Sequence, residues 1–459
     1  MDLNNALCHG SERLLVLRIA LPSMAAMISS SLCSLCDALL LNRFVPQASS
    51  AVSFSIPILT VFQTIGFTLG MGSGGFVSRS LGSGQKEDAL RAASTAFFSA
   101  LAFSLLFCCA GLVLSSAILR LLGANADMLP CARLYLRFVL LCGPLLCANL
   151  VLSSLLRALG STLCNMIAFG AGALVCIPLQ FLLIRSPRAG IWGSGAAMLA
   201  REIVTLILLF ILICKNQHFM LPRPGLFTPT RRIWSAIMRS GLPTLIRQGL
   251  LSLSGALTAR ISASFGPSVL AGMGLCTQAV TLVSSAVIGF GQGFQPVCGY
   301  AFGAGDLGLI RRCYRFCMIC LICSLAMISA AVFFFAPSLF SFLSSVPENA
   351  AFAQKALRVQ SLVFFAQGAV ILMNMLTQAM GMTLRASIIA SSRQGFVLIP
   401  LLLLLPRFFG IHGLIIAQAL SDVLSLVLCF FLSRSCLSQR VTRSSCAPCG
   451  YSGAQTASQ

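Results

Sequence analysis

Long apolar stretches alternate with short polar segments along the whole chain. Twelve such stretches occur, each near or above the length of about 20 residues that crosses the hydrocarbon core of a bilayer. Their approximate limits are 14–42, 50–78, 92–122, 132–157, 163–185, 190–214, 234–260, 268–298, 313–338, 357–381, 385–406 and 410–433. The pattern predicts an all-α membrane protein with twelve transmembrane helices.

The first stretch, between Arg18 and Arg43, contains one carboxylate, Asp37. An acid inside a membrane span is costly and by default marks an ion or substrate pathway. Burial disfavours its ionised form, so Asp37 is a candidate proton carrier, and when ionised it could attract a cationic compound. The alternative is a structural hydrogen bond from Asp37 to a serine or asparagine on another helix.

The composition agrees with a membrane protein and narrows the choice of partners. Hydrophobic residues make up 58% of the 459 residues and charged residues only 9%, whereas soluble domains carry about 25% charged residues. The net charge of +21 could suggest nucleic acid. The basic residues, however, lie at the ends of apolar stretches, as the positive-inside rule describes, so no nucleic-acid partner is expected.

The basic loops also predict an orientation. With both termini in the cytoplasm, the inner loops carry about twice as many Lys and Arg as the outer loops. The segment 215–232 is the densest basic connection and contains proline, which is typical of a linker. We therefore expect a multi-pass membrane protein with a first bundle at 1–214, this cytoplasmic linker, a second bundle at 233–435 and a disordered cytoplasmic tail at 436–459.

The two halves repeat each other. Three motif pairs lie 221 residues apart and a fourth lies 220 apart: Leu21-Pro22 with Leu242-Pro243, Gly82-Ser83-Gly84 with Gly303-Ala304-Gly305, Gly160 with Gly381, and 190–193 with 410–413. Each half holds six spans, an even number, so the halves are expected to be parallel. This predicts two six-helix bundles related by a pseudo-two-fold axis along the membrane normal, with substrate bound between them.

The repeat also compares the acids of the two halves. Asp37 corresponds to Thr258, so this acid is unique to the first half, whereas Glu202 corresponds to Asp422. Whether Asp422 has a function or only packs between helices stays open.

Glu202 follows Arg201 directly. Consecutive helical residues project about 100° apart and do not face each other. We therefore expect Glu202 either to line a cavity or to pair with an arginine of another helix, such as Arg137 or Arg157.

Several glutamines lie within apolar stretches. Gln180 and Gln248 are expected to point inward, either toward a substrate or into a hydrogen bond between helices. Gln292 and Gln295 beside Pro296 predict a kinked, hydrogen-bonded eighth helix. The candidate ion-coupling or substrate residues are Asp37, Glu202, Gln180, Gln248, Gln292 and Asp422.

Other chemistry has little support. The three histidines are dispersed without metal-ligand spacing, and no Walker motif occurs, so neither an enzyme nor direct ATP coupling is expected. The 21 cysteines mostly stand singly inside apolar stretches, as small apolar side chains do. The tail pair Cys446 and Cys449 lacks two further zinc ligands. No cofactor is expected, apart from a coupling proton or sodium ion.

Together, the motifs resemble those of the MATE (multidrug and toxic compound extrusion) family in its bacterial form. They are Leu21-Pro22 with Asp37 and Arg43, GMGSGGFVSRSLGSGQKEDA at 70–89, LLRALGST at 155–162 and FGQGFQPVCGYAFGAGD at 290–306. The resemblance covers nearly the whole chain. It implies a monomeric inner-membrane antiporter, surrounded by lipid, that exports small cationic or other amphipathic molecules in exchange for protons or sodium ions.

One position departs from the family pattern. Many bacterial members carry an acid in the fifth helix where this chain has Gln180, which makes sodium binding there doubtful and leaves Asp37 as the main carrier. The alternative function is a lipid-linked oligosaccharide flippase of the same superfamily. Flippases tend to have two further helices and an arginine-rich cavity, whereas few arginines lie well inside the apolar stretches here (Arg137, Arg201, Arg247 and Arg393).

Overall fold

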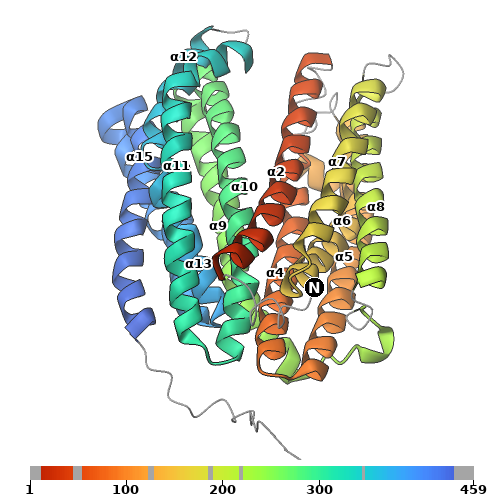
Figure 1. The fold of residues 1–459 in the computed structure, drawn as a ribbon. Helices are drawn as coiled ribbons and strands as arrows, with labels where there is room; N and C mark the ends of the chain where they lie inside the picture. Colours follow the sequence, from red (N-terminus) through yellow and green to blue (C-terminus); the bar gives the residue numbers. More distant parts are fainter. Residues whose placement is uncertain are drawn as a thin grey trace, which may run out of the picture.

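The computed structural model describes residues 12–44, 54–121, 129–184, 190–216, 221–343 and 347–438, and these ranges contain helices and no strand. The helices form two bundles that stand side by side, shown at the right and left of Figure 1. The tail, with its cysteine pair, lies outside the described residues.

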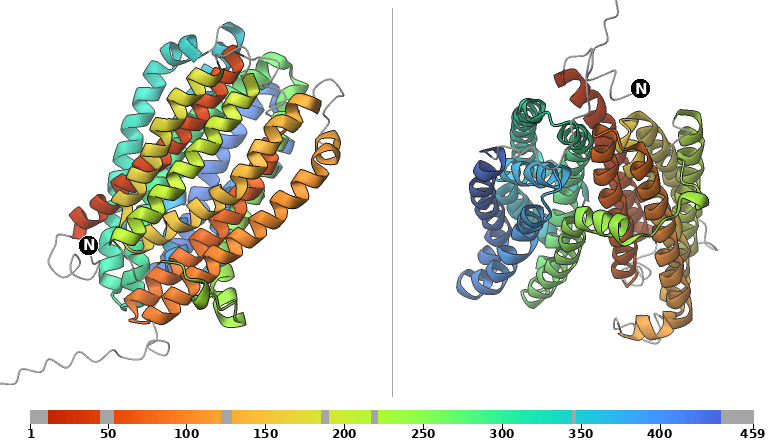
Figure 2. Two further views of the ribbon diagram at one scale, coloured as in Figure 1. Left: turned by 90° about the vertical axis from the view of Figure 1, so that its right-hand side faces the viewer. Right: turned by 90° about the horizontal axis from the view of Figure 1, so that it is seen from below.

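The first bundle has one helix for each of the first six apolar stretches. These are α2 (Glu12–Phe44), α4 (Ile56–Gly82), α5 (Lys86–Leu121), α6 (Leu129–Ala158), α7 (Thr162–Ile184) and α8 (Gly190–Asn216). The described part of the connection to the second bundle contains one short 3₁₀ turn, η2 (Pro224–Leu226). Seen from below in Figure 2, this connection crosses the face where the two bundles lie next to each other.

The second bundle is built from more pieces. They are α9 (Arg231–Ser264), α10 (Pro267–Gly303), α11 (Leu307–Leu343), α12 (Pro347–Ser361), α13 (Phe364–Ala379), α14 (Thr383–Ser391), the π-helical turn η3 (Ser392–Phe396) and α15 (Leu398–Ser438). The helices α12 and α13 form one span bent by 57°. Within α15, Gly410 has φ of 56°, a conformation that glycine adopts without strain, and it separates the last two spans.

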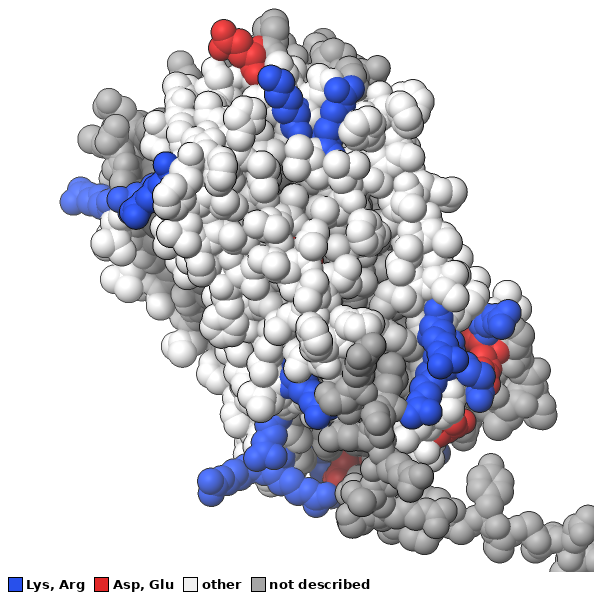
Figure 3. All heavy atoms as spheres, turned by 90° about the vertical axis from the view of Figure 1, so that its left-hand side faces the viewer, with Lys and Arg blue, Asp and Glu red and all other residues white. Residues whose placement is uncertain are grey.

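These pieces account for the twelve predicted spans. Nine helices of the described chain are long and apolar enough to cross a membrane, or ten if α12 and α13 are taken together. Thr383–Leu432 counts there as a single helix although Gly410 divides it. The remaining span is α9, which contains five arginines and is therefore less apolar. Figure 3 shows one face of the molecule, on which Lys and Arg gather toward the two ends and a broad uncharged belt lies between them.

The two bundles touch along a seam of glycines at the end that carries the linker. A Cβ atom on Gly72 would lie 2.4 Å from the carbonyl oxygen of Ile237, and one on Gly303 would lie 2.2 Å from that of Arg79. Gly241 and Gly293 make equally close approaches to the backbone of the first bundle. Small residues allow helices to approach this closely. All these positions lie in the halves of their helices nearest the linker, so the structure is closed at that end.

Arg79 crosses the seam as well. Its Nη1 donates to the carbonyl oxygen of Ala379 at 3.0 Å and its Nη2 to Ser240 Oγ at 2.7 Å, both in the second bundle. Gln378 next to Ala379 donates to Thr244 Oγ1 at 2.9 Å. The closed end is therefore held by close backbone packing and by neutral acceptors around one guanidinium group.

Candidate functional site

Asp37 lies half-buried on α2 and accepts hydrogen bonds from three other helices. Ser194 Oγ on α8 lies 2.5 Å from Oδ1, and Gln180 Nε2 on α7 lies 3.1 Å from the same oxygen. Tyr135 on α6 donates its hydroxyl to Oδ2 at 3.5 Å. All three donors are neutral, so they orient the carboxylate without cancelling its charge.

The sequence indicated Asp37 and its donor Gln180, but it did not indicate the donors Ser194 and Tyr135. The structure places Gln180 in a helix-to-helix hydrogen bond, one of its two predicted roles. Tyr135 could have been recognised as one of only four tyrosines, located in an apolar stretch where its hydroxyl needs a partner. Ser194 has no such signal, because serines occur in many of the spans.

Glu202 is buried and pairs with its own neighbour, so the expectation that Arg201 faces elsewhere was wrong. Arg201 Nη2 lies 2.5 Å from Glu202 Oε1, and Arg201 Nε lies 3.0 Å from it. Asn149 on α6 donates to Glu202 Oε2 at 2.7 Å. The long arginine side chain spans the angle between consecutive helical positions, and Gly172 on α7 leaves room for it, since a Cβ there would lie 3.3 Å from Arg201 Cγ.

Neither of the expected distant arginines is the partner of Glu202. Arg157 is buried and donates instead to the hydroxyl oxygens of Ser153, at 2.5 Å, and Ser154, at 2.8 Å. Arg137 takes part in none of the ion pairs found among the described residues.

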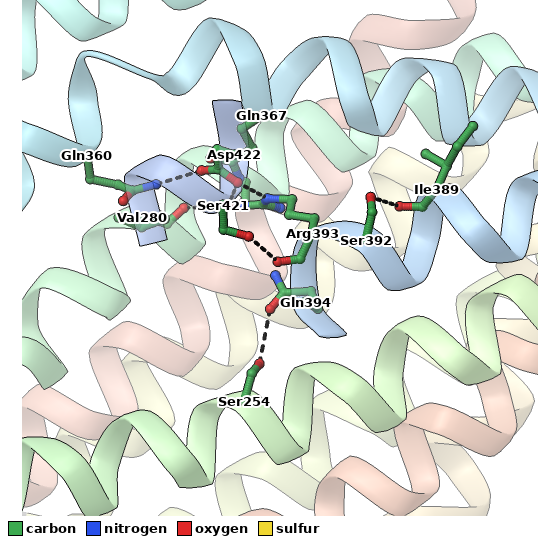
Figure 4. Close-up of polar contacts among 11 residues, drawn as sticks. Ser254, Val280, Gln360, Gln367, Ile389, Ser392, Arg393, Gln394, Ser421 and Asp422 are labelled. Atoms are coloured by element: carbon green, nitrogen blue, oxygen red, sulfur yellow. Dashed lines mark hydrogen bonds and ion pairs between the residues drawn. The ribbon is translucent and has the colours of Figure 1, made fainter. Parts of the chain in front are cut away.

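Asp422 forms a matching cluster in the second bundle, shown in Figure 4. Its Oδ1 lies 2.5 Å from Arg393 Nε, and its Oδ2 accepts from Gln360 Nε2 at 2.7 Å. Ser421 Oγ donates to the carbonyl oxygen of Arg393 at 2.9 Å. Arg393 belongs to the π-helical turn η3, and such turns often occur at functional sites.

The two clusters are related by the repeat, but their arginines are exchanged. Glu202 and Asp422 occupy equivalent positions, and each pairs with one guanidinium group. Arg201 comes from the helix of its acid, whereas Arg393 comes from the preceding span. The equivalents of these two arginines in the other half are Ser421 and Gly172. The equivalent acids of the two halves are therefore neutralised by arginines that come from different helices.

The two remaining candidate residues lie apart from both clusters. Gln248 is buried on α9, next to Arg247. Gln292 lines a cavity of about 240 Å³ between the bundles together with Arg157 and Gln295. The predicted hydrogen bonding of the eighth helix does not hold for Gln292, since both its amide atoms are buried without a partner in the described chain. No three His, Cys, Asp or Glu side chains come together as metal ligands would within the described ranges.

Comparison with known proteins agrees with this architecture. The MatE family model matches residues 22–182 and again 243–404, and the two matches begin 221 residues apart.

Relatives and solved structures extend over most of the chain. The multidrug export protein MepA of Staphylococcus aureus is 24% identical over 390 residues, which are 83% of this chain and 85% of that protein. MepA of Staphylococcus saprophyticus is 22% identical over 387 residues, with the same coverage.

Two solved structures show the same fold. A multidrug resistance MATE family transporter in an outward-facing conformation superposes with a TM-score of 0.88 and 20% identity, covering 94% of this chain and 96% of that one. The Vibrio cholerae MATE transporter VcmN gives a TM-score of 0.87 and 21% identity, covering 93% and 97%. With twelve spans in two bundles and family matches in both halves, the chain belongs to the MATE family of transporters.

Proposed function

We propose that this protein is an ion-coupled antiporter that exports small cationic or amphipathic organic compounds across the inner membrane, with Asp37 as the coupling site. The observation that carries the proposal is the environment of Asp37. It is a half-buried carboxylate inside a membrane helix, and it accepts hydrogen bonds from three neutral donors on three helices. By contrast, Glu202 and Asp422 are each neutralised by an arginine.

The mechanism follows from competition for one negative charge. An ionised Asp37 attracts an organic cation, and a proton or sodium ion at the same carboxylate removes that attraction. Ser194, Gln180 and Tyr135 hold the carboxylate in place in either state. With the linker end closed by the glycine seam, ion binding from the opposite side releases the compound there, and return of the ion toward the linker end resets the site.

The orientation is part of the same proposal. The linker 215–232 and the neighbouring basic residues at the closed end would lie in the cytoplasm, as the positive-inside rule predicts. The closed end then faces the cytoplasm, and the protein acts as a monomer with both termini inside. The two-bundle architecture alone would also fit a flippase, but the family matches and the twelve spans do not favour that function.

Transport by the purified protein in lipid vesicles tests the proposal. The uptake of the fluorescent cation ethidium is followed while a proton gradient or a sodium gradient is imposed separately. One of the two gradients is expected to drive accumulation. Absence of accumulation under both gradients, with protein that is folded and correctly inserted, would contradict antiport of cations.

A further inference from the structure

The second bundle contains a cavity of its own, between α9, α10, α13 and the segment of α14 and η3. Small-molecule sites typically have apolar walls with a few polar groups. This cavity has that composition. Its walls include Leu251, Ile288, Ile371 and Met375, and two arginines, Arg247 and Arg393, reach it.

The charge of this cavity is positive. Arg393 is neutralised by Asp422, whose second carboxylate oxygen is occupied by Gln360. The other two acids described in this bundle lie elsewhere: Asp306 accepts from the backbone nitrogen of Leu309 at the start of α11, and Glu348 contacts Ser268. None of the ion pairs found in the described chain includes Arg247.

An arginine inside a membrane bundle is costly unless an anion or an aqueous cavity compensates it. Arg247 is half-buried and faces the cavity, so the compensating group can come from a ligand. Arginine binds carboxylates through two parallel hydrogen bonds, which makes it the natural partner for such a ligand. Met375 and the branched aliphatic side chains around it can adapt to an apolar body.

The repeat strengthens this assignment. Arg247 lies on α9, the first helix of the second half, and its equivalent in the first half is Ala26. Asp37 lies on α2, the first helix of the first half, and its equivalent is Thr258. Asp37 and Arg247 thus each lack a charged counterpart in the other half, and the two charges have opposite signs.

We propose that the cavity of the second bundle binds amphipathic organic anions that carry a single carboxylate, with Arg247 as the group that recognises the carboxylate. In this arrangement Arg393 is held away from the ligand's charge by Asp422, and the apolar walls contact the ligand's body. Export of such anions would depend on the proposed transport function, and the inference rests on that function only to this extent. Binding itself does not depend on coupling.

Fluorescence titration of purified protein tests the site with two matched probes. Dansylglycine carries a carboxylate, and dansylamide has the same ring system without it. We expect wild-type protein to bind dansylglycine at least about tenfold more tightly than dansylamide, and Arg247→Gln to remove this preference. Arg247→Lys should keep part of it, because the charge remains while the paired hydrogen bonds do not. Arg260→Gln, an exposed position on the same helix, is the control and should bind as wild type.

Equal binding of the two probes by wild-type protein, or an unchanged preference in Arg247→Gln, would overturn the inference. Size-exclusion profiles show whether each variant is folded. If Arg247→Gln does not fold, the comparison of Arg247→Lys with wild type supplies the test. The outcome is separate from that of cation transport. Gradient-driven ethidium transport without dansylglycine preference refutes this site alone, whereas dansylglycine preference without any gradient-driven transport refutes the proposed antiport alone.

Discussion

Arg393 Nε lies 2.5 Å from Asp422 Oδ1, and this pair reproduces, from a different helix, the 2.5 Å pair between Arg201 and Glu202 in the other half. The two buried acids that the repeat relates are therefore neutralised, whereas Asp37 takes part in none of the ion pairs found among the described residues. This difference separates the two acids that are paired inside their own bundles from the acid to which the proposed function assigns ion coupling.

The first prediction concerns the buried ion pair of the first half. Glu202→Gln should lower the free energy of unfolding by about 3–5 kcal/mol, because it strands the buried guanidinium of Arg201. The double variant Arg201→Met/Glu202→Gln should recover much of that loss, since no buried charge remains. Thermal unfolding of the variants in detergent measures both effects. A Glu202→Gln protein of wild-type stability that no longer transports would instead make Glu202 a proton relay.

The second prediction concerns coupling. Asp37→Asn should reduce uphill export to the level of protein-free vesicles while folding and membrane insertion stay intact, because the amide keeps the shape and loses the charge. Binding of neutral compounds should persist. Glu87→Gln removes a solvent-exposed acid and serves as the control. Gradient-driven transport at the wild-type rate by purified Asp37→Asn protein would move the coupling site to another residue.

The third prediction concerns orientation. In a background without reactive native cysteines, Gly225→Cys in the linker should resist an impermeant thiol reagent in intact cells and react in inside-out vesicles. The position is open, since a Cβ there meets no atom within 4 Å. Ser264→Cys, exposed at the opposite end of α9, should show the reverse behaviour. Labelling of Gly225→Cys from outside intact cells would reverse the proposed topology.

The fourth prediction concerns the glycine seam. Gly72→Val places a side chain against the backbone of Ile237, so the closed end should be destabilised by about 1–3 kcal/mol relative to the open end. A cysteine at Ser240, which is buried at the seam, should then react faster with an impermeant reagent in inside-out vesicles. Gly249→Val on α9, the helix that carries Ser240, places its Cβ where no atom lies within 4 Å and is the control. Equal labelling rates in the two variants would show that the seam does not close this end.

Much of this fold follows from periodicity and repetition in the sequence. Apolar length gave the number of spans, and the constant offset of motifs such as Gly160 and Gly381 gave the two bundles. The bend between α12 and α13 and the π-helical turn η3 were not predicted, because both interrupt a span without changing its apolar length.

The candidate sites were less accessible from sequence. The isolated acid Asp37 and its partner Gln180 were found because polar groups in a span are rare. The pairing of Arg201 with Glu202 was missed, because helical geometry fixes where Cβ atoms point but not where a long side chain ends. Asp422 is paired with Arg393 of the preceding span, whereas Glu202 is paired with Arg201 of its own helix. A pairing between two spans depends on how the helices pack, so the pattern within one stretch could not show it.

The hydrogen bonds of Arg79 bear on how fast the protein can turn over. Its acceptors across the seam are carbonyl and hydroxyl oxygens, and hydrogen bonds of a charged donor to such groups contribute about 1.5–3 kcal/mol. Leaving a buried charge without its partner costs about 3–5 kcal/mol, so a pair with a carboxylate would oppose opening more strongly. Since each 1.4 kcal/mol is a tenfold change in an equilibrium, a carboxylate at the seam would hold the gate shut for most of each cycle. In the transport cycle proposed above, the neutral acceptors of Arg79 therefore make opening of this end less costly than a carboxylate would.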